Sequence, residues 1–218
     1  MKTSGAWRGL MAGIVLSFFA AQAVAKEAEE VGLVTLVQGS VQVGESGAKP
    51  TAAVPFVKLL AGTKVEVKAD GRFQIVYLNS GRQETWGANS QIEVGDTESK
   101  SSKAGKSPTV KQLPPAILKG LTQAPMMIAD MRSRQGMIRV RSVGQTGKLE
   151  EAEKNYRDLR AQSQLDDVTP ELFLLATLSQ LKLHDKMKQP LEEMLARQPG
   201  NAEVRALHDS YMKQIAAK

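Results

Sequence analysis

The chain has 218 residues, of which 42% are hydrophobic and none is cysteine, so disulfides, thiolate metal sites and a cysteine nucleophile are excluded. The formal net charge is +6, and it falls to +4 without residues 1–25, which contain Lys2 and Arg8 and no acidic residue. A nucleic-acid-binding protein would concentrate a larger basic surplus on one face. We therefore expect no nucleic-acid partner.

Residues 1–25 have the three parts of a signal peptide: a basic start, the apolar run Met11–Ala20, and small residues up to Ala25. We expect cleavage between Ala25 and Lys26. The alternative, a retained membrane anchor, is disfavoured because the apolar stretch is shorter than the roughly 20 residues that span a bilayer. The sequence predicts an exported protein, periplasmic or secreted, with no membrane span after signal cleavage.

Residues 31–95 have the alternation of short β-strands, rich in branched and aromatic side chains. Asp70-Gly71 and Asn79-Ser80-Gly81 separate apolar runs and are typical of tight turns, Asp70-Gly71 because glycine accepts the positive φ of primed turns. The pattern predicts a small all-β roll or sandwich of roughly six or seven strands.

Residues 96–112 are rich in lysine and serine and almost without apolar side chains. Such a composition cannot offset the conformational entropy lost on ordering. We expect a flexible linker or a long exposed loop.

Residues 113–143 are predicted to form a helix-helix-strand connector. The helical pattern is interrupted at Pro125, which suits the first turn of a second helix, and Gly136 ends that helix. Residues 137–142 then alternate apolar and basic side chains like a strand. This strand either pairs with the β-region or forms an exposed edge.

Residues 145–216 have the periodicity of antiparallel helical hairpins in series. We expect Thr169 to cap the second helix, which is apolar almost all round and should be buried, and Asn201 to cap the last one. The fold class is thus a multidomain protein in which an all-β region precedes an all-α region.

Two stretches of the helical region resemble the second helix of a tetratricopeptide repeat. The first carries Gly147, Ala152 and Tyr156, and the second carries Leu191, Met194 and Pro199. The resemblance implies stacked helix pairs with a curved surface that binds peptides or other proteins.

The β-region resembles a FecR-type domain, an extracytoplasmic module found in iron-transport sigma regulators and in many exported proteins. The residues that carry the resemblance are 34–43, 60–65, 73–82 and 87–92, in that order and spacing. The cytoplasmic anti-sigma segment of a sigma regulator has no counterpart here, so we do not expect direct transmembrane regulation of a sigma factor, even if the β-fold is shared.

Four arginines, Arg132, Arg134, Arg139 and Arg141, fall within ten residues. They could dock an acidic partner or an anionic envelope polymer through bidentate contacts, or they could guard a solvated edge strand against pairing. Trp86 could likewise be a binding platform or a half-buried strand residue.

The sequence offers no catalytic constellation, because phosphate loops, nucleophile elbows and zinc-binding helices of the known kinds are all missing. His184 and His208 have no further ligands at suitable spacing. We expect no enzymatic activity, no cofactor and no metal.

The leading hypothesis is a periplasmic interaction or scaffold protein with a protein partner in the cell envelope. The alternatives are recognition of cell-wall glycan or another envelope polymer by the β-region, and a role as a signalling accessory.

Overall fold

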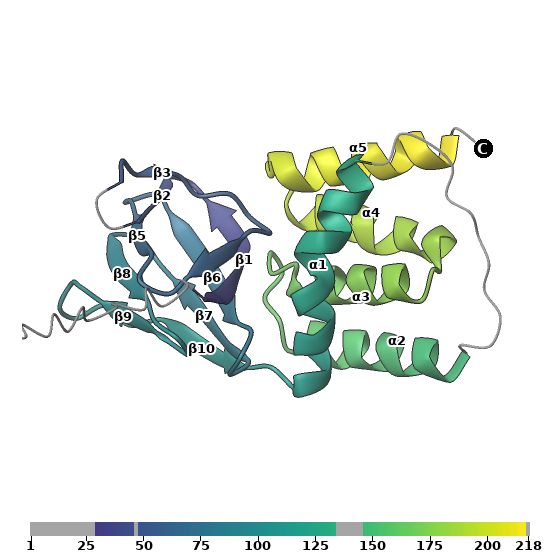
Figure 1. The fold of residues 1–218 in the computed structure, drawn as a ribbon, viewed down its shortest axis with the longest axis horizontal. Coiled ribbons are helices and arrows are strands. Elements are labelled where there is room, and N and C mark those ends of the chain that lie inside the picture. Colours follow the sequence, from purple (N-terminus) through teal and green to yellow (C-terminus); the bar gives the residue numbers. More distant parts are fainter. Residues whose placement is uncertain (1–28, 46–47, 134–145, 217–218) are drawn as a thin grey trace, which may run out of the picture.

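The computed structural model describes residues 29–45, 48–133 and 146–216. A β-sandwich is followed by a layered group of helices (Figure 1), which confirms the predicted order of a β region and then a helical region. The signal cleavage position, Ala25 and Lys26, lies outside the described residues.

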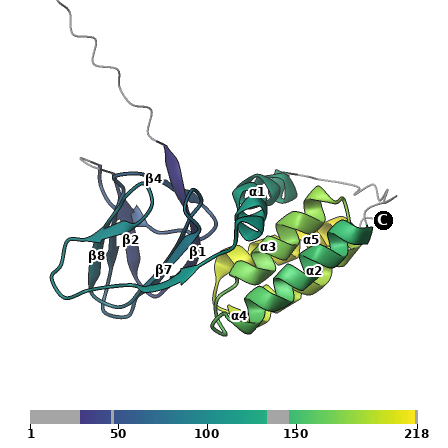
Figure 2. The ribbon, with the colours of Figure 1, turned by 90° about the horizontal axis from the view of Figure 1, so that it is seen from below.

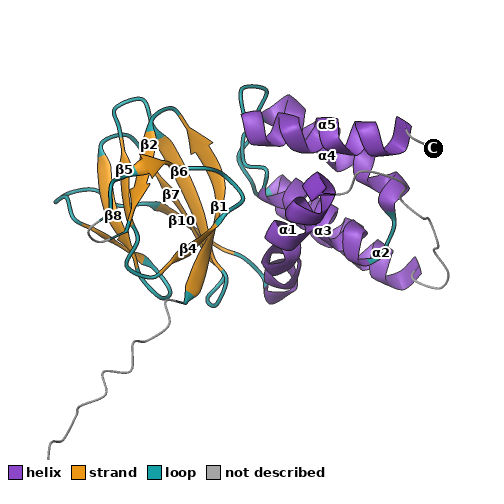
Figure 3. Cartoon of the chain, turned by 45° about the horizontal axis from the view of Figure 1, so that its top comes forward, coloured by secondary structure: helices purple, strands orange, loops and turns teal. Residues whose placement is uncertain are grey.

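The sandwich consists of two five-stranded antiparallel sheets (Figure 3). The first has the order β10 (Thr109–Gln112), β7 (Arg82–Trp86), β6 (Arg72–Tyr77), β1 (Glu30–Gln38) and β4 (Lys58–Leu60). The second has the order β3 (Thr51–Ala52), β2 (Val41–Gly44), β5 (Lys64–Val67), β8 (Ser90–Val94) and β9 (Ser99–Ser101). Buried side chains of alternating positions fill the space between the sheets, among them Phe73, Ile75 and Trp86 from the first and Val65 and Ile92 from the second.

The two predicted turns have different roles. Asn79-Ser80-Gly81 joins the paired strands β6 and β7, and Gly81 has a φ of +74°, so this hairpin turn is confirmed. Asp70-Gly71 instead leads from β5 in the second sheet to β6 in the first. Gly71 is needed there because a Cβ would lie 2.8 Å from the carbonyl oxygen of Ser40.

The predicted linker 96–112 is wrong, because it contains β9 and β10, the edge strands next to β8 and β7. Edge strands are held mainly by main-chain hydrogen bonds, while their side chains are left to solvent. Composition alone therefore could not distinguish this segment from a flexible one.

The helix α1 (Pro115–Ser133) runs through Pro125 without the predicted break. Proline removes one helical hydrogen bond, but residues before and after it, including Leu121 and Met127, are buried on one face of the helix. The burial of these apolar side chains offsets the cost of placing a proline inside the helix. The predicted strand at residues 137–142 lies outside the described residues.

The other helices are α2 (Thr146–Ala161), α3 (Thr169–Gln180), the 3-10 turn η1 (His184–Met187), α4 (Lys188–Arg197) and α5 (Ala202–Ala216). Helices α2 to α5 stack one on another with alternating directions (Figure 1), and the buried α3 contacts α1, α2 and α4. Asn201 caps α5 as predicted, because its Oδ1 accepts from the N–H of Glu203 at 3.0 Å and of Val204 at 3.3 Å.

Thr169, in contrast, is the first residue of α3 and not its cap. Asp167 accepts the N–H of Thr169 at 2.9 Å through Oδ1, which leaves the Thr169 hydroxyl free to face the first sheet. Gln83 on β7 donates to that hydroxyl at 3.0 Å.

The sandwich and the helices share a core. Leu33, Phe56, Val76 and Leu113 belong to the same buried cluster as the apolar faces of the helices. They lie on the side of the first sheet that faces away from the sandwich interior, and Figure 2 shows α1 and the ends of other helices against this side. Sheet and helices are therefore packed as one structure rather than joined by a flexible tether.

Candidate functional site

Trp86 does not present a platform to a partner. It lies in β7 with 1% of its surface exposed, and its Nε1 donates to Glu84 Oε2 at 3.0 Å. The aromatic ring therefore belongs to the sandwich core.

Glu84 is a fully buried carboxylate beside Trp86. Arg82 donates to it at 2.6 Å, and the backbone N–H of Ser99 does so at 3.3 Å. The Arg82 pKa is raised by this hydrogen bond. Nearby, burial raises the pKa of Tyr77, whose hydroxyl lies 2.6 Å from Ser99 Oγ. The contacts of Glu84 orient Arg82 and Trp86 within β7 and join β9 to β7 through Ser99, so the cluster is structural.

Of the four predicted arginines, the structure describes Arg132. It lies in the last turn of α1 and forms an ion pair with Glu203 near the start of α5, so its guanidinium joins the two helices. Arg134, Arg139 and Arg141 lie outside the described residues, and the arginine docking site stays a prediction.

Neither histidine stands in a cluster of metal ligands among the residues that the structure describes. The carbonyl oxygen of His184 accepts from the Tyr211 hydroxyl at 2.8 Å, and His208 Nδ1 lies 3.3 Å from Asp209 Oδ1. Both residues therefore have ordinary structural contacts.

A second buried carboxylate, Glu171, lies in the first turn of α3 and is fully buried. Arg160 on α2 donates to it at 3.1 Å and Arg197 on α4 at 2.9 Å. Because a buried carboxylate needs both charge compensation and hydrogen bonds, this cluster fixes the spacing of α2, α3 and α4. No sequence motif pointed to it.

Tyr156 on α2 connects this cluster to the surface. Its hydroxyl donates to Glu193 on α4 and lies 3.4 Å from Glu171 Oε1. Burial raises the pKa of Tyr156, and the hydrogen bond to Glu193 raises it further. The hydroxyl is thus a neutral donor that holds α2 against α4, while part of the ring remains accessible.

A groove of about 490 Å³ opens beside Tyr156, between α2, α3 and the segment from η1 to α4. Leu174, Leu178 and Pro190 provide an apolar floor. The charged residues around it are Glu153 and Arg157 from α2, Asp185 and Lys186 from η1, and Lys188 and Glu192 from α4. The apolar floor can hold an apolar side chain of a binding partner. The charged residues around it can at the same time pair with charged residues that flank this side chain in the partner.

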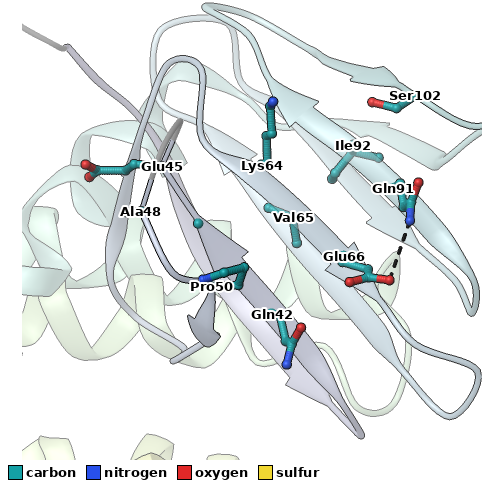
Figure 4. A pocket seen from close by; sticks show the side chains of 11 residues that line it. Gln42, Glu45, Ala48, Pro50, Lys64, Val65, Glu66, Gln91, Ile92 and Ser102 are labelled. Atoms are coloured by element: carbon teal, nitrogen blue, oxygen red, sulfur yellow. Dashed lines mark hydrogen bonds between the residues drawn. The ribbon is translucent and has the colours of Figure 1, made fainter.

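A second hollow, of about 350 Å³, lies on the outer side of the second sheet (Figure 4). Gln42, Glu66 and Gln91 face one another in register across β2, β5 and β8, and Gln91 Nε2 donates to Glu66 at 3.5 Å. The ion pair with Lys68 lowers the pKa of Glu66. This row offers amide and carboxylate groups to solvent.

No helix among the described residues is long and apolar enough to cross a membrane. Comparisons with models of protein families, with curated proteins and with solved structures gave no significant match.

Proposed function

We propose that the chain is an exported, non-enzymatic protein that binds a protein partner in the cell envelope, and that the groove between α2, α3 and α4 is its binding site. Export is supported by the signal-peptide pattern of residues 1–25. The resemblances to a FecR-type domain and to tetratricopeptide repeats support an extracytoplasmic binding role. A non-catalytic role is favoured because the buried carboxylates Glu84 and Glu171 are both occupied by structural partners.

The observation that carries this proposal is the composition of the groove. Its floor consists of leucine and proline side chains, and Tyr156 is held at its side by Glu193 and not left to rotate. Aromatic residues with fixed orientation are common anchors in protein interfaces because little entropy is lost on binding.

The occupant we expect is a short peptide segment with one large apolar side chain flanked by charged residues of both signs. Three basic and three acidic residues line the groove: Arg157, Lys186 and Lys188, and Glu153, Asp185 and Glu192. A uniformly charged polymer would meet repulsion from half of them.

The proposal can be tested by selecting short random peptides on the immobilised protein. Peptides enriched by selection should contain an apolar residue beside both acidic and basic ones. Their affinity should fall about tenfold or more in the double variant Arg157→Glu, Lys188→Glu, which reverses two charges of the groove. Isothermal titration calorimetry measures this change.

Lys119→Glu is the matched control, because Lys119 is exposed on α1 and does not line the groove. Binding should be unchanged in that variant. Selection without any enriched peptide, or enriched peptides that bind the groove variant as well as the control, would refute the proposed site.

The row on the second sheet favours a second candidate function, recognition of an envelope polymer. Planar amide and carboxylate groups can bind the hydroxyl and amide groups of a glycan. Gln42 and Gln91 stand on either side of Glu66 at one level of the sheet (Figure 4).

Cosedimentation with purified cell-wall material tests this second candidate. The protein should pellet with the wall, and the double variant Gln42→Ala, Gln91→Ala should remain in the supernatant. The groove variant above should pellet like the unmodified protein. If the unmodified protein stays in the supernatant, recognition of an envelope polymer is refuted.

A further inference from the structure

The charged residues of the groove between α2, α3 and α4 differ in whether they already have a partner within the chain. Lys188 and Glu192 form an ion pair at 3.6 Å along α4, and Asp185 also has an interaction within the chain. Three further side chains form no ion pair or hydrogen bond with any residue that the structure describes: Glu153, Arg157 and Lys186. A bound partner therefore meets mainly these three charges.

Arg157 lies at the end of the groove where Leu174 forms the floor. Helices α2 and α3 run in opposite directions (Figure 1), and Arg160 on α2 bonds to Glu171 on α3 at 3.1 Å. Arg157 precedes Arg160 by close to one helical turn. Leu174 follows Glu171 by the same interval, so the antiparallel packing brings Arg157 to the level of Leu174.

The other end of the groove, where Leu178 forms the floor, has free charges of both signs. Glu153 lies about one turn before Arg157 on α2. Lys186 comes from η1, and the chain just before it is held beside Leu178, because the N–H of Leu183 donates to the Leu178 carbonyl at 2.9 Å. A charged group of a partner would meet one attractive and one repulsive charge here, so this end does not select a sign.

The charge of Arg157 has no such counterpart at its own end. The neighbouring Glu193 carboxylate is occupied, because Tyr156 donates to one of its oxygens and Gln189 Nε2 donates to the other at 2.9 Å. Arg157 is exposed, and a guanidinium can bind a carboxylate through two parallel hydrogen bonds. A carboxylate of the partner is therefore the group that fits this end.

We infer that Arg157 selects an acidic residue of the bound peptide, within two positions of the apolar side chain that lies on the floor. Leu174 and Leu178 are one turn apart on α3, which is about 6 Å along the helix. Two residues of an extended peptide cover about the same distance. The inference rests on the proposed binding groove and adds to it the residue that determines specificity.

Selection of random peptides on two charge-reversal variants tests the inference. Arg157→Glu and Lys186→Glu change one charge at each end of the groove, and Lys186→Glu is the matched control. Peptides enriched on the unmodified protein and on Lys186→Glu should carry aspartate or glutamate within two positions of the apolar residue. Peptides enriched on Arg157→Glu should carry lysine or arginine there. Both side chains are exposed, so circular dichroism should show that both variants are folded.

A charge exchange gives the quantitative result. A peptide enriched on the unmodified protein is compared with its counterpart in which the selected acidic residue is replaced by lysine, and both are titrated by calorimetry. The lysine peptide should bind the unmodified protein about tenfold more weakly than the original peptide does. On Arg157→Glu the order should reverse, and the lysine peptide should bind about tenfold more tightly.

The outcomes separate this inference from the proposed function. If peptides are enriched but the exchange does not reverse their order, or if Lys186→Glu loses the acidic preference as Arg157→Glu does, the role of Arg157 is overturned while the groove remains a binding site. If no peptide is enriched on the unmodified protein, the groove itself is refuted, and the role of Arg157 with it.

Discussion

Gln83 on β7 donates a 3.0 Å hydrogen bond to the hydroxyl of Thr169, 86 positions later, at the start of α3. The same Nε2 donates to Asp167 at 3.1 Å, and Asp167 in turn accepts the N–H of Thr169. The buried side chain of Gln83 thus donates hydrogen bonds to both the Asp167 carboxylate and the Thr169 hydroxyl at the start of α3. The pairing sets how the helices lie on the sandwich.

Replacing Gln83 by leucine should lower the free energy of unfolding by about 1 to 3 kcal/mol, because the buried groups of Asp167 and Thr169 lose their donor. Urea denaturation followed by circular dichroism measures this change. Gln91→Leu, on the exposed side of the second sheet, should change the free energy by about 0.5 kcal/mol or less. Equal effects of the two substitutions would contradict the importance of the buried pairing.

The sandwich and the helices should unfold in one cooperative transition, because they share a core and a buried hydrogen-bond network. The fluorescence of Trp86 reports on the sandwich, while far-ultraviolet circular dichroism reports mainly on the helices. The two urea curves should coincide. Separate midpoints would show that the sandwich and the helices unfold independently, as expected if residues 96–112 were a flexible linker.

Glu171→Ala should lower the free energy of unfolding by about 3 to 5 kcal/mol, since Arg160 and Arg197 would keep their charges in a partly buried site without the shared carboxylate. Thermal denaturation measures the loss. Glu192→Ala, on the exposed face of α4, is the matched control and should cost about 0.5 kcal/mol or less. A small effect of Glu171→Ala would mean that the arginines find other partners.

Alkaline stability should depend on the tyrosines. Burial raises the pKa of Tyr77, Tyr156 and Tyr211, and these are all the tyrosines of the chain. Because the unfolded chain loses the phenol proton near pH 10, the stabilisation is complete below that pH and is lost as the pH rises above it.

The ultraviolet absorbance of phenolate should therefore stay low above pH 10 and rise in one step together with the loss of circular dichroism. Tyr77→Phe should reduce the height of that step. A gradual rise of phenolate absorbance near pH 10 in the folded protein would contradict the expectation.

The regular elements were largely predictable from the sequence because each buries an apolar face. Alternation found β6, with Phe73 and Ile75 inside, and the continuous apolar character of α3 correctly indicated a buried helix. The pattern could not show that Gln74 and Gln83, on the opposite side of the first sheet, are buried as well. Their partners lie in a distant part of the chain, and periodicity carries no information about which surface covers a polar face.

The candidate sites were less predictable for the same reason. Trp86 and Arg132 were chosen by residue type, but one is buried and the other is ion-paired. Glu171 had one usable signal, a carboxylate in the first turn of an otherwise apolar helix, which indicates a buried partner of opposite charge.

Gly120 gives the last prediction, because it sets the distance between α1 and α3. A Cβ at this position would lie 2.6 Å from Phe173 Cδ2 and 3.1 Å from Thr177 Oγ1. Alanine is the better helix former by about 1 kcal/mol, but the overlap should outweigh this gain. Gly120→Ala should therefore lower the free energy of unfolding by about 1 to 3 kcal/mol, as measured in urea.

Gly147→Ala is the control within α2, because a Cβ there meets no atom within 4 Å. It should leave stability unchanged or raise it by up to about 1 kcal/mol. The double variant Gly120→Ala, Phe173→Leu should be less destabilised than the sum of its single variants, since the smaller side chain makes room for the new methyl group. Strict additivity would show that Gly120 is needed for a reason other than its contact with Phe173.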